Sequence, residues 1–137
     1  MSTSQPKLEV EQRESLIGAA RRAAENAYAP YSNFRVGAAI LLENGQFFSG
    51  CNVENVSYGL TNCAERSAIF AAVSAVGAAV KIRAVAVVNE RNVACSPCGA
   101  CRQVIAELGP QAEIFYQGPN GMQSSTIREL LPDCFRF

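Results

Sequence analysis

The sequence predicts an α/β fold, in which a mixed five-stranded sheet lies between helices in a three-layer α/β/α sandwich. Apolar residues at helical spacing alternate along the chain with strand-like apolar runs. Two short segments that contain an Asn-Gly pair, 43–45 and 118–121, are signals for antiparallel hairpins. The run at 82–89 is apolar on both faces, which is typical of a central strand covered by helices on both sides. Together these observations favour helical layers on both faces of one sheet.

The first part of the chain predicts one helix and one hairpin. An amphipathic helix is expected over 7–28, where leucine and alanine recur at helical spacing, and Pro30 would end it. Strand-like runs follow at 35–42 and 46–54, separated by the first Asn-Gly turn. These two strands should pair antiparallel.

The second part predicts two further helices among the remaining strands. After a loop at 55–61, the run TNCAERSAIF opens a helix that Gly77 would stop. The run SPCGACRQVIAEL at 96–108 predicts the next helix, with Ser96 as N-cap and Pro97 as its first residue. The other expected elements are strands at 82–89, 112–117 and 122–127 and a final helical turn in IRELL.

Length and composition favour a single domain that handles a small molecule. The 137 residues suffice for one core, so we expect one domain over 1–137, with a flexible N-terminus at 1–7. Twelve basic and twelve acidic residues cancel without forming runs, which argues against a nucleic-acid partner. No signal peptide or membrane-length apolar stretch is recognisable, so a cytoplasmic protein without membrane contact is expected. In a reducing compartment the six cysteines indicate metal ligands, catalytic thiols or core residues before disulfides.

Three cysteines lie at the expected starts of two helices. Cys63 opens one helix, and Cys98 and Cys101 form a C-x-x-C at the start of the other. Free N–H groups and the helix dipole favour thiolates there, and thiolates are zinc ligands. A C-x-x-C at a helix start brings two sulfurs to one point, and a parallel neighbouring helix can supply the third. The sequence therefore predicts a zinc site with three protein ligands.

Two charged residues beside Cys63 fit catalysis at such a site. Structural zinc sites usually have four protein ligands, whereas catalytic sites leave one position open. Glu65 lies two residues after Cys63, where its carboxylate could shuttle protons during a hydrolysis. Arg66 shares a helical face with Cys63 and could donate hydrogen bonds to the thiolates, which would offset part of their charge.

Simpler interpretations exist for each of these residues. Asn62 and Glu65 have the spacing of a capping box, which would give the carboxylate a structural role. Arg66 alone could be a solvated helix arginine. The C-x-x-C alone could be a redox pair. A closed structural zinc site could take its fourth ligand from Cys51 or Cys95. The residues by themselves leave these alternatives open.

Three motifs together resemble cytidine deaminase of the small homotetrameric type. They are CAER at 63–66, SPCGACRQV at 96–104 and GCNVENVSYG at 50–59, and the resemblance extends from YAPYSNFRVGAA at 28–39 to RELLPDCF at 128–135. A Cys or His, then x-Glu, then Pro-Cys-x-x-Cys is the known signature of zinc-dependent deaminases. The resemblance implies a cytidine deaminase-like fold, one Zn²⁺ per chain and a homotetramer. It also implies hydrolysis of cytidine and deoxycytidine to uridine and deoxyuridine with release of ammonia, in pyrimidine salvage.

The resemblance also implies roles for individual residues. The three cysteines would bind zinc, and Glu65 would carry protons from water to the pyrimidine and the leaving amine. Tyr58 and Phe135 match positions that reach a neighbouring subunit's site. The implied substrate contacts are Phe34 against the pyrimidine, Asn52 and Glu54 on the ribose, the Ala64 N–H on the base carbonyl and the Ser96 carbonyl on the exocyclic amine.

Three other functions compete with a nucleoside deaminase. A deaminase of RNA or DNA bases would need a charged track and usually a helix between its last two strands, for which 118–121 is too short. Blasticidin S deaminase has similar zinc motifs and size, but its pattern lacks the NVEN and CAER pairings found here. A non-catalytic zinc-stabilised binding module would need a fourth ligand and would not need Glu65. A free nucleoside is therefore the expected substrate.

Overall fold

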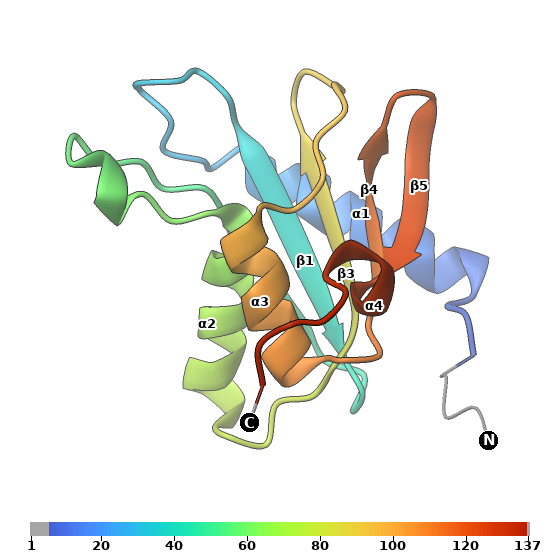
Figure 1. The fold of residues 1–137 in the computed structure, drawn as a ribbon. Helices are drawn as coiled ribbons and strands as arrows, with labels where there is room; N and C mark the ends of the chain where they lie inside the picture. The colour runs from blue at the N-terminus through green and yellow to red at the C-terminus, as the bar shows by residue number, and fades with distance from the viewer. Residues whose placement is uncertain (1–5, 137) are drawn as a thin grey trace.

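The computed structural model describes residues 6–136, which form one five-stranded sheet with helices on both faces (Figure 1). Residues 1–5 of the segment expected to be flexible lie outside the described part of the chain. The elements in chain order are α1 (Val10–Ala24), β1 (Val36–Leu42), β2 (Phe47–Cys51), the short 3-10 helix η1 (Tyr58–Leu60), α2 (Ala64–Val76), β3 (Ile82–Asn89), α3 (Gly99–Leu108), β4 (Glu113–Gly118), β5 (Gly121–Thr126) and α4 (Ile127–Leu130).

The sheet has the strand order β2-β1-β3-β4-β5. β1 pairs antiparallel with both β2 and β3, and β4 pairs antiparallel with β5. β3 and β4 run parallel, and α3 forms the crossover between them. Helix α1 lies on one face of the sheet, and α2, α3 and α4 lie on the other (Figure 1). The expected three-layer sandwich with a mixed sheet is confirmed.

Alternating side chains of the central strands build two core layers. On β1, Ala38, Ile40 and Leu42 pack in the layer under α2 and α3, whereas Ala39 and Leu41 pack in the layer under α1. β3 alternates in the same way and is buried on both faces, as its sequence predicts. Both faces of the central strands are therefore buried under helices.

Two glycines allow helices to approach this sheet closely. A Cβ atom at Gly37 on β1 would overlap the Ala20 carbonyl oxygen of α1. A Cβ atom at Gly50 on β2 would lie 2.5 Å from the Ala68 nitrogen of α2. Both contacts are too short for any side chain, so glycine is required at each position. Because α2 begins just after Cys63, the contact at Gly50 sets how near that helix start lies to the sheet.

Helix α1 is shorter than the expected 7–28. It ends at Ala24, and the chain then leaves the helix to pair with the segment after β2. The Tyr28 N–H donates to the Asn52 carbonyl at 3.0 Å, and the Tyr28 carbonyl accepts from the Glu54 N–H at 2.8 Å. These long-range backbone hydrogen bonds replace the helical ones that local spacing favours.

The predicted start of α3 is wrong by two residues. Helix α3 begins at Gly99 with Cys98 as N-cap, whereas the sequence favours Ser96 as N-cap and Pro97 as the first helical residue. The backbone at Cys98 is extended, with ψ at 168°. The Ser96 hydroxyl accepts from Arg102 instead of from a backbone N–H of the first turn. Ser96, which fits the capping pattern, therefore bonds to the Arg102 side chain and does not cap α3.

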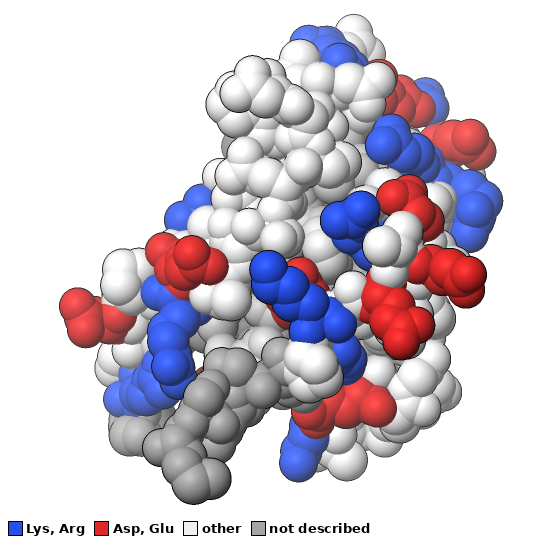
Figure 2. All heavy atoms as spheres, turned by 90° about the vertical axis from the view of Figure 1, so that its right-hand side faces the viewer, with Lys and Arg blue, Asp and Glu red and all other residues white. Residues whose placement is uncertain are grey.

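The glycine stops and turns are confirmed, since Gly45, Gly77 and Gly121 all have positive φ at the predicted breaks. On the side of the molecule that Figure 2 shows, basic and acidic side chains are interspersed. A cavity of ≈ 270 Å³ between α1, β4 and β5 is lined by both Arg13 and Glu14 as well as by apolar residues. Among the described helices, none is long and apolar enough to cross a membrane.

Candidate active site

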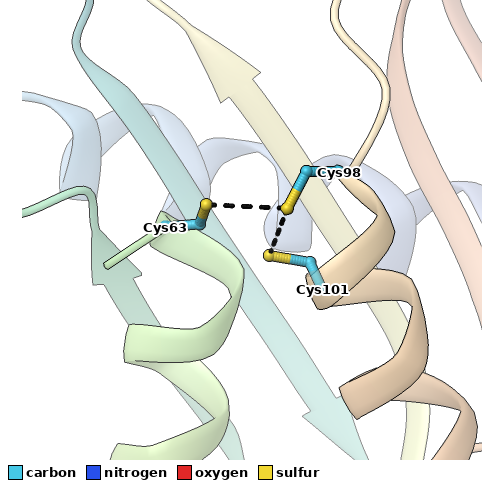
Figure 3. A group of neighbouring side chains, drawn as sticks. All are labelled: Cys63, Cys98 and Cys101. Carbon is cyan, nitrogen blue, oxygen red and sulfur yellow. Dashed lines mark hydrogen bonds between the residues drawn. The ribbon is translucent and has the colours of Figure 1, made fainter. Parts of the chain in front are cut away.

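Three cysteine side chains from two helix starts point toward one another (Figure 3). Cys63 is the N-cap residue of α2 and Cys98 is the N-cap residue of α3, while Cys101 lies one turn into α3. The Sγ atoms of Cys63 and Cys98 are 3.8 Å apart, and those of Cys98 and Cys101 are 3.5 Å apart. All three sulfurs lie within 4.8 Å of one another. The fold therefore brings the sequence-predicted ligands together.

This cluster fits a zinc ion. Zn–S bonds of about 2.3 Å at tetrahedral angles place sulfurs roughly 3.8 Å apart, close to the observed separations. The sequence contains no histidine, so thiolates are the strongest zinc ligands that the chain offers. Within residues 6–136, neither Cys51 nor Cys95 belongs to the cluster. Three sulfurs without a fourth favour an open site over a closed structural one.

The surroundings of Cys63 favour its thiolate. Hydrogen bonds from the Cys101 thiol and the Arg66 guanidinium lower the pKa of Cys63, although burial acts against them. The pKa of Cys101 is raised, because it donates to Cys63 and is buried. Arg66 Nη2 lies 3.3 Å from Cys63 Sγ, so the contact that helical spacing predicts is present. Arg66 thus places a fixed positive charge against the cluster.

Glu65 is a buried carboxyl beside this cluster. Its side chain lies on the first turn of α2, and the residue is 4% exposed. Burial raises the pKa of Glu65 to about 7, and the negative charge of Cys63 acts in the same direction. The backbone N–H of Glu65 and the charge of Arg66 act the other way. A carboxyl that titrates near neutrality can both accept and release protons.

The capping-box interpretation of Glu65 is wrong. Helix α2 has Cys63 and not Asn62 as its N-cap, and no side chain caps its first turn. The Asn62 amide donates to the Ser67 hydroxyl at 3.2 Å instead. The Glu65 carboxyl is therefore not used to close the helix end.

Glu54 holds the loop that precedes β1. Its carboxylate accepts hydrogen bonds from the backbone N–H groups of Tyr31 at 2.9 Å and Ser32 at 3.1 Å, and from the Ser32 hydroxyl. The hydroxyl contact is the main reason why the pKa of Glu54 is lowered. The family resemblance implies that Glu54 binds ribose, whereas its hydrogen bonds to the loop could not be predicted from the sequence.

Asn52 and Arg91 fix the rest of the same loop. The Asn52 amide donates to the Phe34 carbonyl and its oxygen accepts from the Val36 N–H, both at 2.9 Å. Arg91 donates to the Asn33 carbonyl at 3.0 Å, and its guanidinium carbon lies 5.6 Å from the centre of the Phe34 ring. Sequence reasoning missed Arg91, because nothing in its local pattern indicates a contact 58 residues away.

Two backbone positions expected to contact a base lie beside the cluster. Ala64 is the first residue of α2 and is fully buried, and its N–H is among the first four, which have no partner inside the helix. Ser96 precedes α3, and its hydroxyl is 2.9 Å from Arg102 Nη2. Arg102 was missed by sequence reasoning, and its one local signal is its place directly after Cys101.

Tyr58 and Phe135 lie on the surface of the single chain. They are 76% and 71% exposed. Tyr58 is on η1, in the segment that projects from the body of the molecule (Figure 1), and its ring packs edge-on against Tyr31 at 6.1 Å. The Phe135 carbonyl accepts from Gln103 at 3.0 Å. Neither aromatic ring is part of the cysteine cluster of its own chain.

Comparison with known proteins identifies the family. The family model described as the cytidine and deoxycytidylate deaminase zinc-binding region matches residues 10–117. Cytidine deaminase of Halalkalibacterium halodurans is 49% identical over 125 residues, covering 90% of this chain and 93% of that protein. Cytidine deaminase of Sporosarcina psychrophila is 46% identical over 124 residues, covering 89% of this chain and 90% of that protein.

Solved structures agree with this assignment. The crystal structure of cytidine deaminase from Burkholderia pseudomallei is 49% identical, with a TM-score of 0.81, and covers 89% of this chain and 98% of that one. That of cytidine deaminase from Mycobacterium tuberculosis is 42% identical, with a TM-score of 0.82, and covers 94% of this chain and all of that one. Because motifs, fold and three-cysteine cluster agree with these matches, the chain belongs to the cytidine deaminase family of zinc-dependent hydrolases.

Proposed function

We propose that this protein hydrolyses cytidine and deoxycytidine to uridine and deoxyuridine with release of ammonia, and that it acts in pyrimidine salvage. The observation that carries the proposal is the buried carboxyl of Glu65 beside an open cluster of three cysteines. The family match and the relatives named cytidine deaminase support the reaction.

Cys63, Cys98 and Cys101 would hold one zinc ion per chain. When bound, zinc supplies the Lewis acidity that activates the attacking water at neutral pH. Three thiolates carry more charge than the ion neutralises, which would weaken that acidity. Arg66 donates to Cys63 Sγ and so withdraws part of the excess negative charge.

Glu65 would carry the protons. Its carboxylate would take one proton from the water that attacks C4 and give it to the pyrimidine ring nitrogen. It would then take the second proton from the hydroxyl added at C4 and deliver it to the amine, which leaves as ammonia while the C4 carbonyl forms. A buried carboxyl with a pKa of about 7 suits a group that alternates between both states.

Five residues would position the nucleoside. Phe34 would pack on the pyrimidine, the Ala64 N–H would hold the base carbonyl, and the Ser96 carbonyl would accept from the exocyclic amine. Asn52 and Glu54 would bind the ribose hydroxyls. Their loop contacts leave capacity for this, since the Asn52 amide has a second N–H and a carboxylate has about four acceptor sites.

A free nucleoside is a better substrate than a base within RNA or DNA. β4 and β5 pair antiparallel, and residues 119–120 alone connect them. That turn leaves no room for the crossover helix that a parallel pair would need. The interspersed charges on the side shown in Figure 2 also lack the single-sign track that a nucleic-acid strand favours.

We infer that the chain works as a homotetramer in which neighbouring subunits complete each site. Apolar side chains are exposed on the projecting segment and at the end of the chain: Val53, Val56, Tyr58, Leu60 and Phe135. Exposed apolar groups of this extent are typical of protein interfaces. Tyr58 and Phe135 would then reach a neighbour's site. Light scattering should give four times the mass of the 14.7 kDa chain, and a monomer that is fully active would contradict the inference.

We also propose the cytoplasm as its compartment. Within residues 6–136 the six cysteines form no disulfide, as is usual in reducing compartments. Thiol alkylation in intact cells, before lysis, would test this.

The decisive experiment is a substrate comparison with zinc counted in the same sample. Purified protein is incubated with cytidine, deoxycytidine, cytosine, CMP and blasticidin S, while the absorbance of the aminopyrimidine and the release of ammonia are followed. Turnover of both nucleosides at about one zinc per chain is the expected result. Preferential turnover of blasticidin S, or zinc without any turnover, would contradict the proposal.

A further inference from the structure

One guanidinium joins the candidate site to the end of the chain. Arg102 on α3 donates from Nε to the Pro97 carbonyl at 2.7 Å and from Nη2 to the Ser96 hydroxyl at 2.9 Å. Its Nη1 donates to the Leu130 carbonyl at 2.8 Å, 28 residues further along the chain. Two acceptors thus belong to the segment that enters α3, and the third belongs to α4.

The segment 96–98 depends on this support. Cys98 has an extended backbone and is an N-cap without a side-chain hydrogen bond to the helix, and Pro97 has no N–H to donate. Ser96 would contact the exocyclic amine and Cys98 would hold the metal. A displacement of this short segment would therefore move a substrate contact and a metal ligand together.

The residue after Arg102 strengthens the link to the end of the chain. Gln103 donates from Nε2 to the Phe135 carbonyl at 3.0 Å. Two consecutive side chains of α3 therefore hold carbonyl groups at both ends of the segment 130–135. Because Arg102 also holds Ser96, the C-terminal segment and the entry to α3 share one anchor.

We propose that Arg102 is a positioning residue for the deaminase reaction, which fixes the substrate-facing segment 96–98 and makes its position depend on the docking of the segment 130–135. The proposal rests on the proposed function. Arginine is required because three acceptors lie around one planar group, which its fixed fork of donors can satisfy at once. A lysine ammonium at this position carries the charge but cannot reach all three acceptors from one atom.

The test compares Arg102→Gln, Arg102→Lys and the matched control Arg128→Gln, which removes an exposed arginine from α4. Zinc content, kcat and KM for cytidine, and the inhibition constant of uridine are measured for each. Uridine lacks the exocyclic amine that Ser96 would hold. In Arg102→Gln we expect KM for cytidine to rise about tenfold, which is about 1.4 kcal/mol and so the scale of one lost hydrogen bond, while the uridine constant changes less than about twofold.

Further outcomes follow from the same measurements. Zinc should stay at about one per chain in all three variants, Arg102→Lys should recover only part of the KM, and Arg128→Gln should match the unmodified protein. Equal changes for cytidine and uridine at full zinc content, or full recovery by lysine, would each overturn the positioning role. An unchanged KM accompanied only by a lower melting temperature would show that Arg102 is merely structural.

Hydrogen exchange separates this proposal from the proposed function. Peptides that cover 95–99 and 130–135 should both exchange faster in Arg102→Gln than in Arg128→Gln, whether or not the protein turns over any substrate. Gln103→Ala should accelerate exchange in 130–135 with a smaller effect on 95–99. If the unmodified protein is inactive, the proposed function fails. If exchange at 95–99 is unchanged in Arg102→Gln, the anchoring role fails independently.

Discussion

The starts of α2 and α4 have similar sequences and different structures. Asn62 and Glu65 before α2, and Thr126 and Glu129 before α4, share the spacing of a capping box. At α4 the box is complete, since the Thr126 hydroxyl accepts from the Glu129 N–H at 3.2 Å and the Glu129 carboxylate accepts from the Thr126 N–H at 2.9 Å. At α2 neither side chain caps the helix.

Helix α2 lacks the stabilising side-chain cap that α4 has, and its start is the one that lies at the candidate active site. A side-chain cap contributes roughly 1 kcal/mol to helix stability. At α2, as at α3, the N-cap is instead a cysteine, and the N–H groups of the first turn remain available beside the cluster. The carboxylate that could have capped α2 is instead buried beside the three-cysteine cluster. A capping motif therefore has to be judged by its surroundings as well as its spacing.

Removal of zinc should have the largest effect, and it should act at the start of α2 and not at the start of α4. A chelator is expected to abolish turnover and to lower the melting temperature, because the ion links the starts of α2 and α3 and stabilises the folded state by mass action, with about 2.7 kcal/mol at one hundred times its dissociation constant. Added zinc should restore both. Calorimetry and the cytidine assay check this, and full activity in zinc-free protein would contradict the zinc-dependent mechanism.

Glu65→Gln and Glu129→Gln make the same chemical change at the two starts. The first should lower kcat by roughly 10²–10⁴-fold, because the proposed proton carrier is lost, while zinc and fold are retained. The second should leave kcat and stability nearly unchanged, because a glutamine oxygen can still accept from the Thr126 N–H. Steady-state kinetics and zinc counting decide, and near-normal turnover by Glu65→Gln would remove Glu65 from the mechanism.

Arg66→Gln should have an intermediate effect. We expect the rate to fall by roughly 10–100-fold at unchanged zinc content, since losing a charge-assisted hydrogen bond costs about 1.5–3 kcal/mol. The matched change Arg128→Gln controls for the loss of one positive charge. If the rate of Arg66→Gln equals that of the unmodified protein, the charge of the thiolates is offset in another way.

Thr126→Ala should have the smallest effect. It removes a side-chain cap that is not part of the cysteine cluster, so the free energy of unfolding should fall by about 1 kcal/mol while kcat and KM stay within about twofold. Urea unfolding followed by fluorescence or circular dichroism gives the stability. A large loss of activity at unchanged stability would show that the start of α4 takes part in the site.

Local sequence patterns predicted the fold and the cysteine cluster, whereas contacts between residues distant in the sequence became known only from the structure. Asn-Gly turns and the C-x-x-C depend on neighbouring residues, so the hairpins, the sheet and the three-cysteine cluster could be predicted from the sequence. The start of α3 was misplaced because the Ser96 hydroxyl is used by Arg102, which Leu130 helps to hold. The loop contacts of Asn52 likewise join residues 16 and 18 positions apart, and no periodic pattern records them.

The absence of a side chain at Gly50 limits how the protein can be redesigned. Since α2 packs directly on β2 there, the site cannot be enlarged by moving α2 away from the sheet without breaking the contact between them. Gly37 fixes α1 on the opposite face in the same way. Room for a bulkier nucleoside has to come from the loops at 29–35, 52–57 and 90–98, at positions other than those proposed to bind zinc or the nucleoside. Libraries that aim to widen the substrate range should vary these loops and leave both glycines unchanged.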